Sequence, residues 1–258
     1  MTAAASLNTY IGNQALSNSF ANGVEVATAT SGYVPLIPVG TIAQFIDPYW
    51  GGVEAIRLSI PTSTAVRVGA ISTLQADNSY NAVPNTANLG QSLAFSLSDV
   101  PSNAAYVQYA WFQIAGRGPV LSGASVAANT AFGITAAGTA GANAAGKQIL
   151  NARVQIAATT TVVKANTQTQ NGSSFLRVTN SDGWFVGMAL SGTGIPASTV
   201  VGSISVDGTV VGMVQTGTTT AQNATATGST SVTGTYNDGT RYWNVATFNR
   251  PFAQGAIT

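Results

Sequence analysis

The sequence contains no cysteine and no histidine. Without cysteine there are no disulfides, no thiolate metal sites and no cysteine nucleophile. Without histidine the commonest general base is missing, so a Ser-His-Asp triad and the usual zinc sites are excluded as well. We therefore expect a protein that is not an enzyme and that holds no metal and no cofactor.

Charged residues are scarce. Nine basic and eight acidic residues make up 7% of the 258 residues, against about 25% in a typical globular protein. No two basic residues are adjacent, and the net charge is +1. Nucleic acids and acidic membranes are bound by clustered cations, so we expect neither as a partner. Because monomers usually stay soluble through surface charge, this composition favours a protein whose surface is largely covered by partners.

Long apolar runs are absent too. The first seven residues, MTAAASL, have neither a basic nor an apolar region of the kind that begins a signal peptide. No stretch approaches the roughly 18 apolar residues of a membrane span. Together with the lack of cysteine, these features predict assembly in a reducing cytoplasm.

The residues that are present favour β-structure. Hydrophobic residues make up 45% of the chain and occur in short runs between Gly, Pro and Asn, which is typical of strands. Residues 149–156 alternate apolar and polar side chains, as a half-buried strand does. Glycines oppose a helix in the Ala-rich region that follows residue 124, apart from a short one near 124–131. Further strands are predicted at residues 55–60, 65–69, 106–115, 175–179, 184–190 and 199–206.

Composition divides the chain into three parts. Residues 1–32 are small and polar and predict an extended N-terminal arm. Residues 33–156 predict a β-barrel or β-sandwich-like domain, completed by the aromatic-containing segment 241–258. Residues 157–240 are rich in Thr and Gly, with 18 Thr between positions 156 and 235, and predict a small, possibly projecting β-sandwich module. The class is therefore all-β.

Two dipeptides in the Thr-rich part predict tight hairpin turns. They are Asn171-Gly172 and Asp207-Gly208. Both central positions of a type I′ turn need a positive φ, which Asn, Asp and Gly tolerate best.

Two motifs invite a chemical interpretation. Asp47 and Glu54 flank an aromatic pair, and a glycosidase needs only two carboxylates about 5–10 Å apart. Residues 141–147 (GANAAGK) have the spacing of a phosphate-binding loop, but Gln148 replaces the hydroxyl residue that holds magnesium. The residues that follow alternate as a strand, whereas such a loop opens a helix. We interpret the second motif as a Gly-rich turn entering a strand.

Three segments resemble the capsid decoration, or head-stabilising, proteins of tailed phages. They are residues 109–120 (YAWFQIAGRGPV) with the Ala/Gly-rich loop up to 146–150 (GKQIL), and the ending 249–258 (NRPFAQGAIT). Residues 187–196 (GMALSGTGIP), together with 224–228, are similar to β modules of phage virion proteins. These segments cover about half of the chain.

The resemblance implies a virion protein on the outer surface of an assembled capsid. It implies binding to the major capsid protein, homo-oligomerisation as a trimer or dimer, and no cofactor. Candidate capsid or subunit contacts are aromatic residues in loops or terminal arms: Tyr10, Phe20, Tyr49, Trp50 and Phe252.

Two alternatives remain. One is a head or tail fibre component that recognises a host-surface receptor or glycan through the Thr-rich module. The other is a virion enzyme that cleaves polysaccharide with a carboxylate pair.

Overall fold

The computed structural model describes residues 14–15, 24–27, 35–47, 50–205, 207–218, 220–238 and 240–256. These residues form strands and no helix, with 53% of the chain in strands. The predicted all-β class is confirmed. Within these ranges, no helix is long and apolar enough to cross a membrane.

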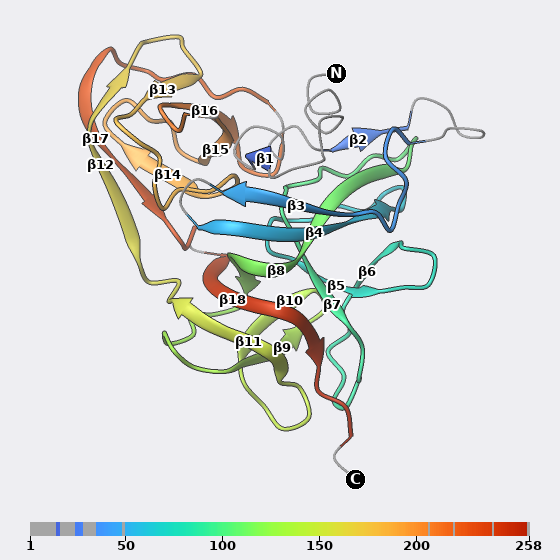
Figure 1. Ribbon diagram of the computed structural model, residues 1–258. Helices are drawn as coiled ribbons and strands as arrows, with labels where there is room; N and C mark the ends of the chain where they lie inside the picture. Colours follow the sequence, from blue (N-terminus) through green and yellow to red (C-terminus); the bar gives the residue numbers. More distant parts are fainter. Residues whose placement is uncertain are drawn as a thin grey trace.

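A twelve-stranded sheet makes up the larger part of the molecule (Figure 1). Its central path runs β1-β3-β4-β8-β7-β5-β6. Of the other five strands, β2, β10 and β18 pair with β8, β11 pairs with β18, and β9 pairs with β10. The 15-residue strand β8 pairs with β2, β4, β7, β10 and β18, so it organises the whole sheet. The strands are β1 (Gln14–Ala15), β2 (Glu25–Val26), β3 (Ile42–Asp47), β4 (Gly51–Ile60), β5 (Ile71–Leu74), β6 (Tyr80–Ala82), β7 (Leu93–Ser96), β8 (Gln108–Ser122), β9 (Phe132–Ala136), β10 (Thr139–Ala142), β11 (Ile149–Ile156) and β18 (Tyr242–Ala253).

Aromatic side chains fill the core of this sheet. Phe95 and Phe248 stack with their ring centroids 4.5 Å apart, and Phe45 meets Trp111 edge to face at 5.2 Å. The last strand, β18, pairs antiparallel with both β8 and β11. The chain therefore returns to the large sheet after the Thr-rich part.

The Thr-rich part is a closed six-stranded barrel, seen at the upper left of Figure 1. The prediction of a sandwich for this module was wrong in form, because β17 pairs with both β12 and β14 and so closes the sheet on itself. Closure removes the exposed edges that a small sheet would otherwise present. The strands follow the order β12-β13-β16-β15-β14-β17: β12 (Thr161–Thr169), β13 (Phe175–Arg177), β14 (Ala189–Gly192), β15 (Thr199–Ile204), β16 (Val210–Gln215) and β17 (Gly228–Thr235).

The barrel and the large sheet share one hydrophobic cluster. Trp243 of β18 is fully buried, its ring lies 6.0 Å from that of Phe185, and its indole N–H donates to the Val68 carbonyl at 3.0 Å. Gly187 also lies against Val68, because a Cβ at position 187 would be 2.6 Å from Cγ1 of Val68. The boundaries drawn from composition remain a prediction about independent folding, and this junction is where they can be tested.

Local expectations had mixed outcomes. The strand at 149–156 is confirmed with its bounds, as β11. The strand at 65–69 was wrong, because only Val66 forms a bridge, to Val100, while the Val68 N–H donates to the Asp99 carboxylate at 2.9 Å. Gly69, with φ of +77°, then turns the chain.

The short helix near 124–131 was also wrong. The Val126 N–H donates to Oδ1 of Asn244 at 3.0 Å, and the Thr130 hydroxyl donates to the Ala127 carbonyl at 2.6 Å. A distant strand thus provides the partner that a helix would have provided locally.

Both turn dipeptides lie in turns, but not in the predicted type I′ form. The Gly208 N–H donates to the Ser205 carbonyl at 2.9 Å, so Gly208 is the last residue of its turn, with φ of +69°. In the other turn only Gly172 has a positive φ, of +82°.

Candidate functional site

The five predicted interface aromatics do not form one cluster among the described residues. Tyr10, Phe20 and Tyr49 lie outside the described residues. Trp50 packs against the shared cluster, with its ring 5.9 Å from that of Phe185. Phe252 is half-buried on β18, opposite Leu150. An interface role for these residues stays a prediction.

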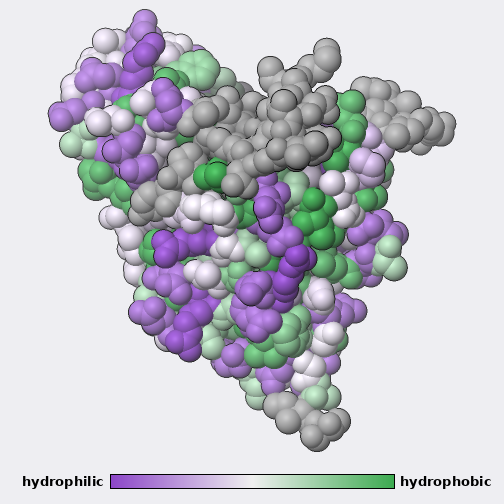
Figure 2. Space-filling model, in the orientation of Figure 1, coloured by the Kyte–Doolittle hydropathy of each residue, from purple (hydrophilic) through white to green (hydrophobic). Residues whose placement is uncertain are grey.

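A different group of apolar side chains reaches the surface near the N-terminus. Four large hydrophobic residues among those described before position 47 are exposed: Val26 (38%), Leu36 (65%), Ile42 (47%) and Ile46 (41%). We call them the N-terminal apolar patch, and Figure 2 shows hydrophobic side chains at the surface over β3. Strand alternation explains the two isoleucines, because Phe45 between them points into the core.

A buried ion pair holds this region together. The carboxylate of Glu25 on β2 pairs with Arg57 of β4, and the same carboxylate accepts the Leu36 N–H at 2.9 Å. Arg57 is 2% exposed and lies over the rings of Tyr109 and Trp111. This ion pair therefore joins β2, which carries Val26, and the Leu36 backbone to β4.

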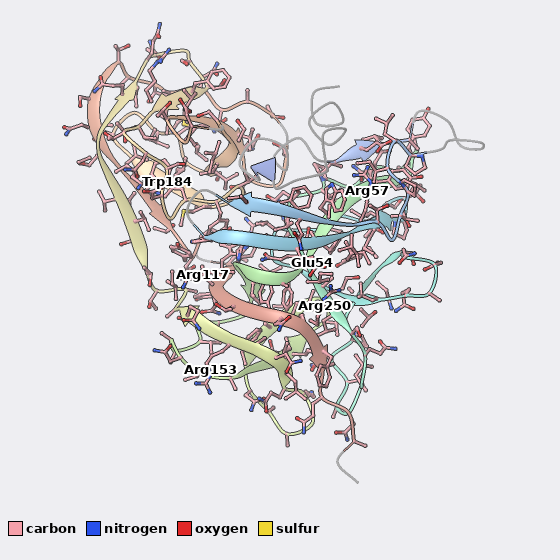
Figure 3. The ribbon with its side chains drawn as sticks, in the orientation of Figure 1. Glu54, Arg57, Arg117, Arg153, Trp184 and Arg250 are labelled. Carbon is pink, nitrogen blue, oxygen red and sulfur yellow. The ribbon has the colours of Figure 1, made fainter. Side chains whose placement is uncertain are left out.

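Two cations lie on strands β8 and β11 of the large sheet. Arg153 of β11 and Arg117 of β8 both pair in register with Thr247 of β18, which places their side chains on the same side of three adjacent strands (Figure 3). Within the described residues neither forms an ion pair, whereas nearby Arg250 binds Glu54 at 2.5 Å. The Glu54 carboxylate, one of the two considered for a sugar-cleaving pair, is thus held by an arginine. The side chain of Asp47 lies outside the described residues.

The phosphate-loop-like segment runs from one strand to another. It starts in β10 and ends just before β11, with φ of +71° at Gly146. The Lys147 ammonium donates to Oδ1 of Asn85 at 2.8 Å. The segment is a Gly-containing turn entering a strand, as its alternation predicted. In the described parts of the chain, no three acidic side chains come together as a metal site.

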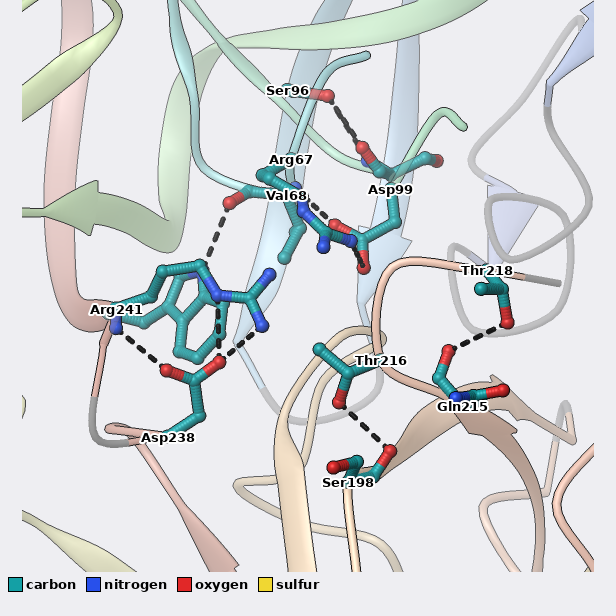
Figure 4. A network of polar contacts seen from close by, with 12 residues as sticks. Arg67, Val68, Ser96, Asp99, Ser198, Gln215, Thr216, Thr218, Asp238 and Arg241 are labelled. Atoms are coloured by element: carbon teal, nitrogen blue, oxygen red, sulfur yellow. Dashed lines mark hydrogen bonds and ion pairs between the residues drawn. The ribbon is translucent and has the colours of Figure 1, made fainter. Parts of the chain in front are cut away.

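Polar groups surround the junction of sheet and barrel (Figure 4). Asp99 accepts the Val68 N–H at 2.9 Å and the Arg67 guanidinium at 3.3 Å. Burial raises the pKa of Asp99, against the opposing effects of that N–H and of the two arginines, Arg67 and Arg241. Arg67 also lies against Gly217 of the barrel, where a Cβ would be 2.5 Å from its Nη2. These groups stabilise the junction.

The barrel carries an open pocket of about 630 Å³ on its outer surface. We call it the barrel groove; its lining includes Gln168, Gln170, Ser173, Phe175, Arg177 and Thr227. Phe175 is 56% exposed, although Leu176 beside it is fully buried. The groove thus combines an accessible aromatic ring with amide, hydroxyl and guanidinium groups.

Strand register produces this arrangement. Phe175 and Arg177 share the outer face of β13, and their partners on β16 are Gly212 and Val210. Because Gly212 has no side chain, the Phe175 ring lies over it, with Cε1 3.7 Å from the position of a Cβ. Gln168 of β12 pairs with Arg177 from the other side. Three strands therefore contribute to one surface.

The groove was not predicted from the sequence. The available signal was local. Leu176 and Val178 are two positions apart and both buried, so the strand turns them inward and turns Phe175 outward. This alternation identifies an outward-facing aromatic residue. It does not identify the residues around the ring, because these depend on strand pairings between residues far apart in the chain.

In comparisons with protein-family models, with curated proteins and with solved structures, nothing matches this chain.

Proposed function

We propose that this protein is a structural, non-catalytic component of a tailed-phage virion that binds the outer surface of the assembled capsid and stabilises it. Its partners would be the major capsid protein and further copies of itself, as a trimer or dimer. The observation that carries the proposal is the N-terminal apolar patch in a chain of very low charge. Exposed apolar groups at one site are typical of a surface that a partner covers.

The stabilisation would follow from mass action. A protein that binds the assembled shell and not its separate subunits shifts the equilibrium toward the shell. A small free energy per contact, repeated over many copies, would resist the pressure of packaged DNA.

Salt dependence tests the nature of this attachment. With nine cations and eight anions in 258 residues, few ion pairs form across any one interface. At about 1 M salt the Debye length is about 3 Å, which weakens exposed ion pairs but not apolar burial. We expect the number of copies bound per particle to change little between washes at low and at high salt. Release of most copies at high salt alone would contradict an apolar interface.

A pair of variants locates the attachment surface. Ile42→Asn with Ile46→Asn should reduce the copies bound per particle by more than tenfold, because it removes two apolar contacts and adds amides that need new partners. Arg117→Gln with Arg153→Gln, on strands β8 and β11 rather than on β3, is the matched control and should bind normally. All four side chains are at least partly exposed, so we expect both variants to fold, which a thermal unfolding curve checks. The opposite ranking would place attachment at these two arginines.

A second role is favoured by one observation. The barrel groove presents an exposed aromatic ring on the Thr-rich module, as expected for a head or tail fibre component that recognises a host-surface receptor. Attachment through the N-terminal apolar patch and recognition through the barrel groove use different residues, so one chain can do both.

A further inference from the structure

The barrel groove has a stacking surface surrounded by hydrogen-bonding groups. More than half of the Phe175 side chain is exposed, so its ring is accessible for stacking against a ligand. Around it, Gln168 and Gln170 offer amide donors and acceptors, and Ser173 and Thr227 offer hydroxyls. Gln170 and Arg177 make no side-chain hydrogen bond within the described residues. Their capacity is available to a ligand.

The floor of the groove is built before any ligand arrives. Backbone hydrogen bonds join residues 172–174 to β16 and to the segment that precedes β17: Gly172 N–H to Ala224 O (2.9 Å), Ala224 N–H to Ser173 O (2.8 Å) and Met213 N–H to Ser174 O (2.8 Å). The Thr227 hydroxyl accepts the Asn171 N–H at 2.9 Å. A preformed site loses little entropy on binding, so weak individual contacts are sufficient.

The charge of the groove indicates the charge of its ligand. Arg177 is the charged residue among the described residues that line it, and no acidic residue lines it. Arg177 takes part in none of the ion pairs of the described residues. A guanidinium group with free donors binds a carboxylate through two parallel hydrogen bonds.

The closed barrel argues against an extended peptide. Peptides commonly bind such domains by adding a strand to an open sheet edge, and this barrel has no open edge because each of its six strands has two neighbours. A sugar ring instead presents an apolar face for stacking and hydroxyl groups around its rim. That pattern matches a single aromatic ring bordered by amides and hydroxyls.

We infer that the barrel groove binds an acidic saccharide, with Phe175 stacked on a sugar ring, Arg177 on its carboxylate and Gln168 and Gln170 on its hydroxyls. This inference rests on the second, receptor-recognising role and names its ligand class. It is independent of the shell-binding role.

The test uses the full-length protein and a panel of acidic oligosaccharides: oligogalacturonate, hyaluronate oligosaccharides and sialyllactose. Methyl-esterified oligogalacturonate and maltotetraose are the neutral counterparts. Binding is followed by chemical-shift changes in a titration. We expect at least one acidic probe to bind at least about tenfold more tightly than the neutral probes. A hydrogen bond to a charged group contributes enough free energy for about a tenfold change in affinity.

Variants assign the contacts. Phe175→Ala should weaken binding by more than tenfold, and Arg177→Gln should reduce acidic probes to the affinity of neutral ones. Val163→Ala is the matched control, because Val163 is also exposed on the barrel (55%) and lies outside the groove lining. Failure of every acidic probe to bind, or equal binding by Phe175→Ala, would overturn the inference. Particle-bound copy number for Phe175→Ala separates the two proposals: we expect it to be unchanged, whatever the saccharide result.

Discussion

The large sheet and the barrel are stabilised by different means within one chain. Thirteen of the seventeen charged residues lie outside positions 161–235, and so do all four ion pairs of the described residues. The barrel contains Lys164, Arg177, Asp182 and Asp207 as its charged residues. It relies on strand closure, a small apolar interior and hydroxyl groups that bond to the backbone, such as Thr167 to the Lys164 carbonyl at 2.9 Å.

This difference shows how a chain with 7% charge divides its few ionic groups. Ion pairs hold the large sheet where distant segments meet, as Glu25 with Arg57 and Glu54 with Arg250 do. A closed barrel needs no such connections, because every strand is already bonded on both sides. Its one groove cation, Arg177, therefore stays available for a ligand.

Trp243→Ala should have the largest effect, because this residue belongs to both regions. Its side chain is fully buried and bonds to Val68. Truncating a buried Trp costs about 3–5 kcal/mol, and the loss should uncouple the barrel from the sheet. Urea unfolding, followed by fluorescence of single-Trp variants that retain Trp111 in the sheet or Trp184 in the barrel, measures both midpoints.

The matched control for this experiment is Phe175→Ala, an exposed aromatic that should cost less than about 0.5 kcal/mol. Coincident midpoints after Trp243→Ala, with a cost below about 1 kcal/mol, would mean that Trp243 is not the residue that couples the two regions. Two separated midpoints would support the predicted independence of the 157–240 module.

Glu25→Ala should have the second largest effect on stability. It tests whether ion pairs stabilise the large sheet. The change leaves Arg57 buried without this carboxylate, which costs about 3 kcal/mol or slightly more. Glu54→Ala is the control: Arg250 is 55% exposed, so its ion pair is worth at most about 1 kcal/mol. Chemical denaturation gives both values. Adding Arg57→Leu to Glu25→Ala should restore part of the loss, and equal costs for the two glutamates would show that burial does not determine the value of these ion pairs.

The sequence predicted features that depend on neighbours in the chain. The alternation of residues 149–156 determines which side chains face inward, and β11 has those bounds. The all-β class follows from many such runs. Features that depend on distant pairing were missed. Barrel closure needs β12 to pair with β17, joining residues such as Val162 and Gly234.

The candidate site, too, depends on strand pairings that the sequence did not predict. The prediction selected aromatics in loops and arms; Trp50 packs against the shared cluster, and an interface role for these aromatics stays a prediction. The exposed apolar and aromatic residues found instead lie in strands, apart from Leu36. Their exposure depends on which residue lies opposite, as Gly212 does for Phe175, and a one-residue change of register would reverse it.

Acid titration of Asp207 should give the smallest effect and tests the barrel alone. Hydrogen bonds from the Ser205 hydroxyl (2.6 Å), the Thr209 hydroxyl (2.8 Å) and the Thr209 N–H (3.1 Å) lower the pKa of Asp207 to about 2, from an ordinary value of 3.8. Because the pKa is lower in the folded state, the carboxylate stabilises the fold above pH 3.8. This contribution is lost as the pH falls from about 4 to about 2.

Asp207→Asn should therefore flatten the decline of thermal stability over that pH range, with a Tm change on the order of 1–2 °C because the group is exposed. Asp77→Asn is the matched control in the large sheet. The hydroxyl and N–H of Ser79 lower the pKa of Asp77 in a similar turn, but with two hydrogen bonds instead of three. We expect it to flatten the curve less. A Tm profile for Asp207→Asn that runs parallel to that of the wild type between pH 2 and pH 4 would show that this turn adds nothing to barrel stability, which would then come from closure and apolar packing alone.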